Sequence, residues 1–424
     1  MTRCARRFGP SRRFGPHERV LIDMGVSEAA TPSTRLPALD AIRAAALLLG
    51  IVLHASLSFV PGIGAELWPM SDVNKSTAMS VTMFVIHIFR MSVFFFVAGL
   101  LARAVLERRG FVAFWRERAR RIAVPLVLGW IVCFVLIAGI ALWALSRANG
   151  GKLPSPLPAA MVESGLNLLH LWFLYVLLWL YAISIALRTA LRAADRRGSI
   201  RGFIDRALGA LVSKHVGSLV LAVPIAAALF LIKDWNRWAG IPTPGYTVVP
   251  PAASLFIYCY VFMMGWAFDR QRHLLNVLAA NWPVNFALGL VAALYCISTA
   301  GADPSLVVAQ TSSERLLYAV AYAVALMGWT FAFVGAGIRF FAKPHPVISY
   351  VAEASYWMYI AHLPLVMALQ TTVMLADVHW SIKYLFINVV CIGSLLTTYH
   401  FWVRSTWIGR LLNGGKPATA HATS

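Results

Sequence analysis

Ten apolar runs, each long enough to cross the hydrocarbon core of a bilayer, constrain this chain more than any other feature. A helix rises about 1.5 Å per residue, so roughly 20 apolar residues cross about 30 Å. The chain is 59% hydrophobic and only 13% charged, which excludes an ordinary soluble domain. We therefore predict an all-α polytopic membrane protein, a bundle of about ten transmembrane helices. The runs occupy residues 38–60, 81–102, 122–145, 167–187, 215–232, 252–268, 283–300, 316–338, 347–375 and 384–403.

The basic residues lie mainly in alternate loops. Of the 37 Lys and Arg residues, 28 lie in six segments: 1–37, 102–121, 188–214, 269–282, 339–346 and 404–424. The five intervening loops hold 7, and Arg43 and Arg90 lie inside spans. Loops rich in Lys and Arg face the cytoplasm, so both termini are predicted to be cytoplasmic. This topology, with attraction to anionic membrane lipid, explains the net charge of +20 without nucleic-acid binding.

The two ends of the chain are polar and contain no apolar run. Residues 1–34 are predicted to be a disordered basic cytoplasmic tail, and residues 406–424 a short cytoplasmic tail. The five cysteines have no metal-ligand spacing, so neither a disulfide nor a metal site is expected. The sequence also has no phosphate-binding glycine loop or nucleophile elbow, and we expect no permanently bound cofactor. Any chemistry must come from polar residues within the spans.

The first span holds two ionisable residues, Arg43 near its start and His54 near its end. They are eleven residues apart, close to three turns of 3.6, so they share one face of the helix. An ionisable side chain at membrane depth costs about 2.5–3.5 kcal/mol on insertion scales and tends to line a functional cavity. The alternative is that Arg43 snorkels to the cytoplasmic surface and His54 is a packing residue.

Two other spans carry ionisable residues at matching depths. His87 and Arg90 of the second span fall in the same layer as His54 if the first two helices touch. In the ninth span, Glu353 and His362 match the depths of the two ionisable residues in the first span. We therefore expect an acid opposite the arginine of the first span and a second histidine beside His54. The alternative for His87 is an interfacial histidine at a helix end.

Two further segments hold candidate binding residues. In FWRERARRIAVP, Arg118 and Arg121 are three residues apart at the predicted start of the third helix. Guanidinium groups bind phosphate through two hydrogen bonds, although a positive-inside topology signal has the same composition. HLWFLYVLLWLY opens the fourth span with His170 and Trp172, which are either substrate contacts or part of an aromatic belt.

These segments resemble blocks of the integral-membrane acyltransferase family 3. RLPALDAIRAAALLLGIVLH resembles its first span, which is marked by a basic residue, ten intervening residues and a histidine, and Arg43 and His54 match that mark. Four further segments resemble later blocks of the family, in the family's order: FRMSVFFFVAGL, RERARRIAVP, HLWFLYVLLWLY and EASYWMYIAHLPL. Two of the segments, IHIFRM and EASYWMYIAHLPL, resemble the glucan-modifying branch of the family. Ala44 departs from the family pattern, in which a glycine often follows the arginine. The resemblance implies a membrane acyltransferase domain over residues 35–405.

The resemblance implies an O-acyltransferase of the bacterial inner membrane. An acetyl or succinyl group would pass from cytoplasmic acyl-CoA to a hydroxyl of a periplasmic or envelope glycan. A histidine can act as the general base that removes the proton of a hydroxyl, and an arginine can stabilise the negative charge that develops on the thioester carbonyl oxygen. The implied residues are catalytic His54, Arg43, Arg90 and His87, donor-binding Arg118 and Arg121, and substrate-binding Glu353, His362, His170 and Trp172.

A second function class uses the same kinds of residue. A transporter or flippase for a glycan, lipid or polyol also lines its path with polar side chains, but no inverted repeat is visible in the sequence. A structural membrane partner without chemistry would leave the buried ionisable residues unexplained.

Overall fold

The computed structural model describes residues 36–64, 68–158, 167–215, 217–244, 247–304 and 311–414. Within these ranges every regular element is helical, which confirms the all-α prediction for that part of the chain. The predicted tail at 1–34 lies outside the described residues. So do residues 415–424 of the predicted second tail, whereas Trp407–Asn413 of that segment form a helix, α13.

The ten predicted apolar runs all coincide with helices. The helices that carry the candidate site are α1, α2, α5 and α11, joined to short turns at η1, η2 and η3. The bounds are α1 (Pro37–Ser56), η1 (Leu57–Phe59), α2 (Thr77–Arg118), η2 (Ala119–Ala123), α3 (Val124–Ala148), η3 (Leu169–Leu171), α5 (Trp172–Ala194), α6 (Ser199–Val212), α7 (Gly217–Phe230), α8 (Ala252–Arg270), α9 (His273–Ala300), α10 (Ser312–Phe340), α11 (Pro346–Val373), α12 (Trp380–Thr398), η4 (Tyr399–Val403) and α13 (Trp407–Asn413).

The described residues contain seven helical runs that are long and apolar enough to cross a membrane, or eight if α6 and α7 form one bent span. One of these runs, Thr77–Ala148, has 72 residues and contains two of the predicted spans. α11 is 28 residues long but is not among the seven, and its apolar sequence is interrupted by Glu353, His362 and Gln370. α7 has 14 residues, about 21 Å, and is too short to cross alone. The fold is therefore a polytopic membrane bundle, and a count of ten crossings stays a prediction.

Several segments predicted to be basic loops are helical instead, including residues 273–282, which begin α9. Residues 102–118 continue α2, and residues 199–212 form α6. Leu, Ala, Arg and Glu, which dominate the first part of the α2 extension, favour helix, so the polar sequence does not end the helix. The axis of α2 breaks only at Gly110, whose φ of 77° is a conformation that glycine adopts without a steric penalty.

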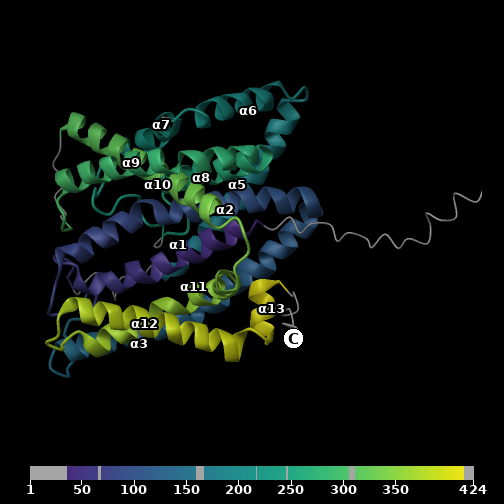
Figure 1. Ribbon diagram of the computed structural model, residues 1–424. Coiled ribbons are helices and arrows are strands. Elements are labelled where there is room, and N and C mark those ends of the chain that lie inside the picture. The colour runs from purple at the N-terminus through teal and green to yellow at the C-terminus, as the bar shows by residue number, and fades with distance from the viewer. Residues whose placement is uncertain are drawn as a thin grey trace, which may run out of the picture. The chain divides into compact units, whose positions relative to one another are not determined.

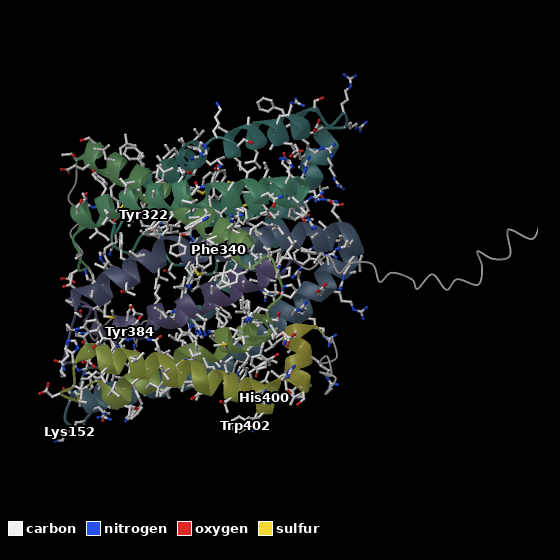
Figure 2. All side chains as sticks on the ribbon, viewed as in Figure 1. Lys152, Tyr322, Phe340, Tyr384, His400 and Trp402 are labelled. Atoms are coloured by element: carbon white, nitrogen blue, oxygen red, sulfur yellow. The ribbon has the colours of Figure 1, made fainter. Side chains whose placement is uncertain are left out.

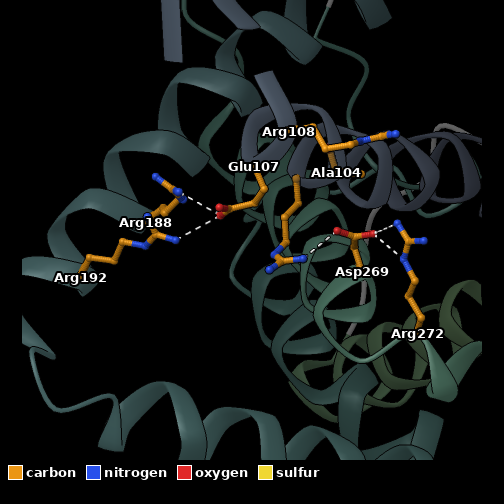
Figure 3. Close-up of polar contacts among 8 residues, drawn as sticks. Ala104, Glu107, Arg108, Arg188, Arg192, Asp269 and Arg272 are labelled. Carbon is orange, nitrogen blue, oxygen red and sulfur yellow. Dashed lines mark hydrogen bonds and ion pairs between the residues drawn. The ribbon is translucent and has the colours of Figure 1, made fainter. Parts of the chain in front are cut away.

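Ion pairs hold this basic end of the bundle together. Arg188 and Arg192 of α5 both donate to Glu107 of α2, at 2.9 and 3.1 Å (Figure 3). Asp269 at the end of α8 lies between two further arginines, one from α2 and Arg272 (Figure 3). The arginines of the predicted loops therefore connect helices as well as marking one side of the membrane.

α1 is surrounded by other helices. It packs against α2, α10, α11 and α12, and Figure 1 shows it running between α2 and α11. α2 in turn packs against α8 so closely that a Cβ added to Gly99 or Gly265 would lie 1.9 Å from a backbone oxygen of the other helix. Small residues permit such contacts between helices in lipid. Polar residues on α1 therefore have neighbours on several helices.

Apolar side chains cover the outside of α3. Val127, Ile131, Val132 and Val135 are each at least half exposed. A continuous exposed apolar face of this kind is what a lipid-facing helix presents. In Figure 2, Lys152 lies toward one end of the bundle, beyond α3, whereas the His400 and Trp402 side chains lie toward the other end.

Candidate active site

Three histidines from separate parts of the chain meet inside the bundle. The ring centroid of His54, on α1, lies 5.3 Å from that of His362, on α11. The His362 centroid lies 5.0 Å from that of His170, in η3. His170 and His362 are buried, whereas His54 stays partly accessible. The structure thus confirms that a second histidine lies beside His54, and it adds a third.

Pro364 explains how His170 is held. Proline has no N–H, so the carbonyl of Ile360, four residues earlier in α11, lacks its usual helical donor. His170 Nε2 donates to this oxygen at 3.0 Å, and the Cys133 thiol donates to it at 3.3 Å. The Tyr359 hydroxyl donates to the His170 carbonyl at 2.7 Å. The proline therefore leaves an acceptor inside the bundle that ties η3 and α3 to α11.

Arg90 of α2 completes the cluster. Its guanidinium lies against Gly50 of α1, where an added Cβ would be only 2.2 Å from Nη1. It is within electrostatic range of His54, His170 and His362. Arg90 Nε is buried and has no hydrogen-bond partner in the described part of the chain. A cationic donor of this kind can stabilise an oxygen that becomes negative.

His87 lies one turn before Arg90 on α2. Its Nε2 donates to the carbonyl of Ala239 at 3.1 Å, in the loop after α7 that also carries buried Trp235. His54 and Arg90 both lie within electrostatic range of His87. His54, His87 and Arg90 are therefore close enough to interact electrostatically, and their common depth in the membrane stays a prediction.

The loop after η1 covers His54. The Trp68 ring is stacked on His54 at a centroid distance of 6.4 Å. Fully buried Gln370 accepts from Trp68 Nε1 at 3.1 Å and donates to the carbonyl of His54 at 2.9 Å. A buried ion pair between Asp72 and Lys383, at 2.5 Å, ties the same loop to α12. The loop is therefore fixed to α11 and α12 above the histidine cluster.

Three of these residues, Trp68, Tyr359 and Gln370, were not predicted. Gln370 has a signal in the sequence, because it is an amide within an apolar run and follows His362 by eight residues, a little over two turns. Tyr359 and Trp68 have no comparable signal. Their positions depend on how η3 and the loop after η1 return to the bundle.

Arg118 and Arg121 lie around the π-helical turn η2, just before α3. Arg118 stacks over Phe114 and Tyr181, with its guanidinium carbon 5.0 and 5.1 Å from the ring centroids, and its Nε is buried without a partner among the residues that the structure describes. Arg121 donates to Glu117 at 2.9 Å and to a backbone carbonyl of α13 at 3.2 Å. π-helical turns are rare and often occur at functional sites. Of the two arginines, Arg118 keeps more hydrogen-bonding capacity for a ligand.

Arg43 lies with this second group of arginines. Its ion pair with Asp40, one turn earlier on α1, spans 3.7 Å. The acid that the structure pairs with Arg43 therefore comes from its own helix, and not from α11 as predicted, because an i, i+3 neighbour is already within reach. Arg43 is also within electrostatic range of Tyr181, as are Arg118 and Arg121.

The other two predicted substrate contacts have different neighbours. Glu353 is within electrostatic range of Tyr350 and Tyr399, in the part of α11 before the histidine cluster. Trp172 is stacked on Tyr258 of α8 at 5.9 Å and is 9% exposed, so it packs between helices. In the part of the chain that the structure describes, no group of three or more His, Cys, Asp and Glu side chains is arranged to hold a metal ion.

Comparison with known proteins identifies the family. A family model described as an acyltransferase domain matches residues 36–405. The chain belongs to this acyltransferase family. Glucans biosynthesis protein C of Salmonella paratyphi B and that of Salmonella heidelberg are each 29% identical to it over 167 residues. The match covers 38% of this chain and 41% of the relatives, so the chain spans about two fifths of their length. No solved structure matches the chain.

In this member of the acyltransferase family, the two motif residues of α1 lie in different clusters of polar side chains. Arg43 and His54 are separated by about 16 Å along α1, at 1.5 Å per residue. His54 lies with Arg90 and the other histidines, whereas Arg43 lies near Tyr181 and Arg118. One helix therefore connects an arginine-rich group to a histidine-rich one.

Proposed function

We propose that this chain is a membrane-embedded O-acyltransferase that moves an acetyl or succinyl group from acyl-CoA to a hydroxyl of a periplasmic or envelope glycan. The main support is a partly accessible histidine, His54, one helical turn after Gly50, against which the Arg90 guanidinium lies, and within electrostatic range of that guanidinium. Family membership supports acyl transfer as the reaction. The name of the matched relatives, glucans biosynthesis protein C, supports a glycan acceptor.

In the proposed reaction, His54 acts as the general base. It takes the proton of the acceptor hydroxyl as the oxygen attacks the thioester carbonyl and forms the new C–O bond. Arg90 stabilises the negative oxygen of the tetrahedral intermediate, and His87 lies within electrostatic range of Arg90. The C–S bond then breaks, and the CoA thiolate takes the proton from His54. The products are the ester and the CoA thiol.

We propose that the phosphates of acyl-CoA bind at the other group, with Arg118 as the main contact. Arg43 and Arg121 also lie around Tyr181, and guanidinium groups bind phosphate through paired, charge-assisted hydrogen bonds. A donor held there could extend its acyl group along α1 toward His54. CoA is a substrate in this scheme and is not a resident cofactor.

Replacement of Arg118 with glutamine should weaken acyl-CoA binding. A hydrogen bond to a charged group contributes about 1.5–3 kcal/mol, which corresponds to an increase of about 10- to 100-fold in the KM for acyl-CoA. Arg116→Gln is the matched control, because it removes the same charge from an exposed position of the same segment. A normal KM for acyl-CoA in the Arg118→Gln/Arg121→Gln double variant would reduce the pair to a topology signal.

We also propose that the bundle crosses the bacterial inner membrane ten times, with both termini in the cytoplasm and its basic face against anionic lipid. The distribution of basic residues between alternate loops supports this orientation. Reporter fusions after residues 150, 240 and 305 should be external, and fusions at 110, 200 and 415 cytoplasmic. An inversion among the first four loops would contradict the orientation.

The reaction can be tested with purified protein in liposomes. Acyl-CoA labelled in the acyl group is supplied with a soluble glucan, and the glucan is then recovered and counted. Label on the glucan through an ester bond is the expected result. Movement of unlabelled glucan across the bilayer, with acyl-CoA left intact, would contradict acyl transfer and favour a transporter or flippase.

A further inference from the structure

Three enclosed ring nitrogens of the histidine cluster, His170 Nδ1 among them, lack hydrogen-bond partners in the described part of the chain, and two of the three lie on the neighbouring rings of His54 and His362. His54 Nδ1 and His362 Nε2 are both buried, and neither has a partner among the described residues. The two ring centroids are 5.3 Å apart and the ring planes are inclined by 47°. Buried polar atoms are nearly always paired in folded proteins, so each of these atoms needs an explanation.

The other nitrogen of His362 determines its tautomer. Nδ1 lies 2.7 Å from the carbonyl oxygen of Tyr359. A carbonyl oxygen can only accept, so Nδ1 carries the proton and Nε2 of the neutral ring carries a lone pair. The unpartnered nitrogen of His362 is therefore an acceptor, and it is enclosed beside a ring whose own enclosed nitrogen lacks a partner.

We propose that His362 is a positioning residue: a small rotation of the His54 ring, whose Nδ1 is not in hydrogen-bond geometry with His362 Nε2 in the structure, lets Nδ1–H donate to that acceptor. A proton on Nδ1 makes Nε2 the basic nitrogen of His54. Nε2 is not among the buried atoms that lack a partner, and His54 as a residue stays partly accessible, so we assign the ligand-facing edge of the ring to Nε2. The arrangement selects the tautomer and the orientation that a general base needs. This inference rests on the proposed role of His54, and it replaces the direct substrate contact predicted for His362.

The surroundings of His362 hold its ring in this state. His170 packs against it nearly at right angles, with 88° between the ring planes, and His170 Nε2 is itself bound to Ile360. Tyr359 supplies the carbonyl that fixes Nδ1. Arg90 is the charged group within electrostatic range of both His54 and His362. The His362 ring can therefore form one further hydrogen bond, as an acceptor through Nε2.

A third group that orients a histidine base is a recurring device in acyl transfer. Such a group acts on the chemical step and not on the binding of either substrate. Loss of His362 should therefore lower kcat and leave the KM values for both acyl-CoA and the acceptor nearly unchanged. A substrate-binding histidine would instead change the KM for the acceptor.

The direct test is nitrogen-15 NMR of the full-length protein with labelled histidine, in lipid and without substrates. The signals of the two rings are assigned by their loss in His54→Asn and His362→Gln. The expected result is a protonated Nδ1 on His54 and a coupling between His54 Nδ1 and His362 Nε2. A proton on His54 Nε2, or no coupling between the rings, would overturn the proposal. This readout needs no acyl transfer, so it separates failure of the inference from failure of the proposed function.

Kinetics of two variants give a second test. Glutamine at position 362 keeps an acceptor oxygen, whereas leucine removes it. His362→Leu should lower kcat by about 10- to 100-fold, the range typical of losing a group that orients a metal-bound histidine, and His362→Gln should recover most of this loss. His273→Gln, at an exposed histidine of α9, is the control. Equal kcat in the leucine variant and the unmodified protein would overturn the proposal.

Discussion

Alanine at position 54 is expected to lower acyl transfer by about 10²- to 10⁴-fold, the effect typical of losing a general base. The substitution removes the imidazole but no residue that a span needs, so the protein should still insert into the membrane. The measurement is transfer per folded molecule, with insertion and thermal stability determined on the same preparation. A packing histidine would behave differently, because its loss would lower stability and leave the activity per folded molecule intact.

Asparagine at position 54 sharpens this test. Its amide can form hydrogen bonds but cannot accept a proton at neutral pH. His54→Asn should therefore be nearly as slow as His54→Ala, and His273→Asn should behave like the unmodified protein. A near-normal rate in His54→Asn would move the base to His87 or His362.

Loss of the Arg90 guanidinium is expected to have the second largest effect. Removing one oxyanion donor costs about 10²- to 10³-fold in kcat in well-studied acyl-transfer enzymes, and Arg90→Gln should fall in this range. Acyl-CoA binding should change little, because the phosphates are proposed to bind near Arg118. Steady-state kinetics with acyl-CoA and acceptor varied separately distinguish the two effects. An unchanged kcat would exclude Arg90 from the oxyanion site.

Gly50 permits a test of Arg90 that leaves the arginine in place. A methyl group at Gly50 would lie 2.2 Å from Arg90 Nη1, so the guanidinium must move. Because the atom displaced is the end of a flexible side chain, Gly50→Ala should lower kcat, by up to about 10²-fold for a displacement near 1 Å, with little loss of stability. Gly139→Ala in α3 is the matched control, since nothing lies within 4 Å of a Cβ there. Equal kcat in the two variants would show that the position of Arg90 is not critical.

The sequence was sufficient to predict where the long apolar helices lie. All ten apolar runs coincide with helices, because hydrocarbon thickness fixes the length of an apolar run. The pairing of His54 with His362 followed from the constant rise per residue, which converts sequence position into depth. Depth alone does not determine rotation about the helix axis. The ion pair of Arg43 with Asp40 instead of Glu353 shows that limit.

Other features depend on tertiary contacts that a local pattern does not carry. Residues 102–118 are polar enough to suggest a loop, yet they remain helical and are fixed by Glu107 and its partners on α5. The binding of His170 to α11 requires both the missing N–H of Pro364 and the return of η3 to that level of the bundle. The position of Trp68 over His54 likewise depends on the path of a loop.

We propose that this chain acylates an envelope glycan through His54. Mass spectrometry of cell-envelope glycans tests it most directly, in cells with the protein, cells without it and cells with His54→Asn at equal protein levels. We predict that the glycans gain the mass of one acyl group only where the unmodified protein is present. Identical glycan masses in all three strains, or acylation that persists with His54→Asn, would contradict the account.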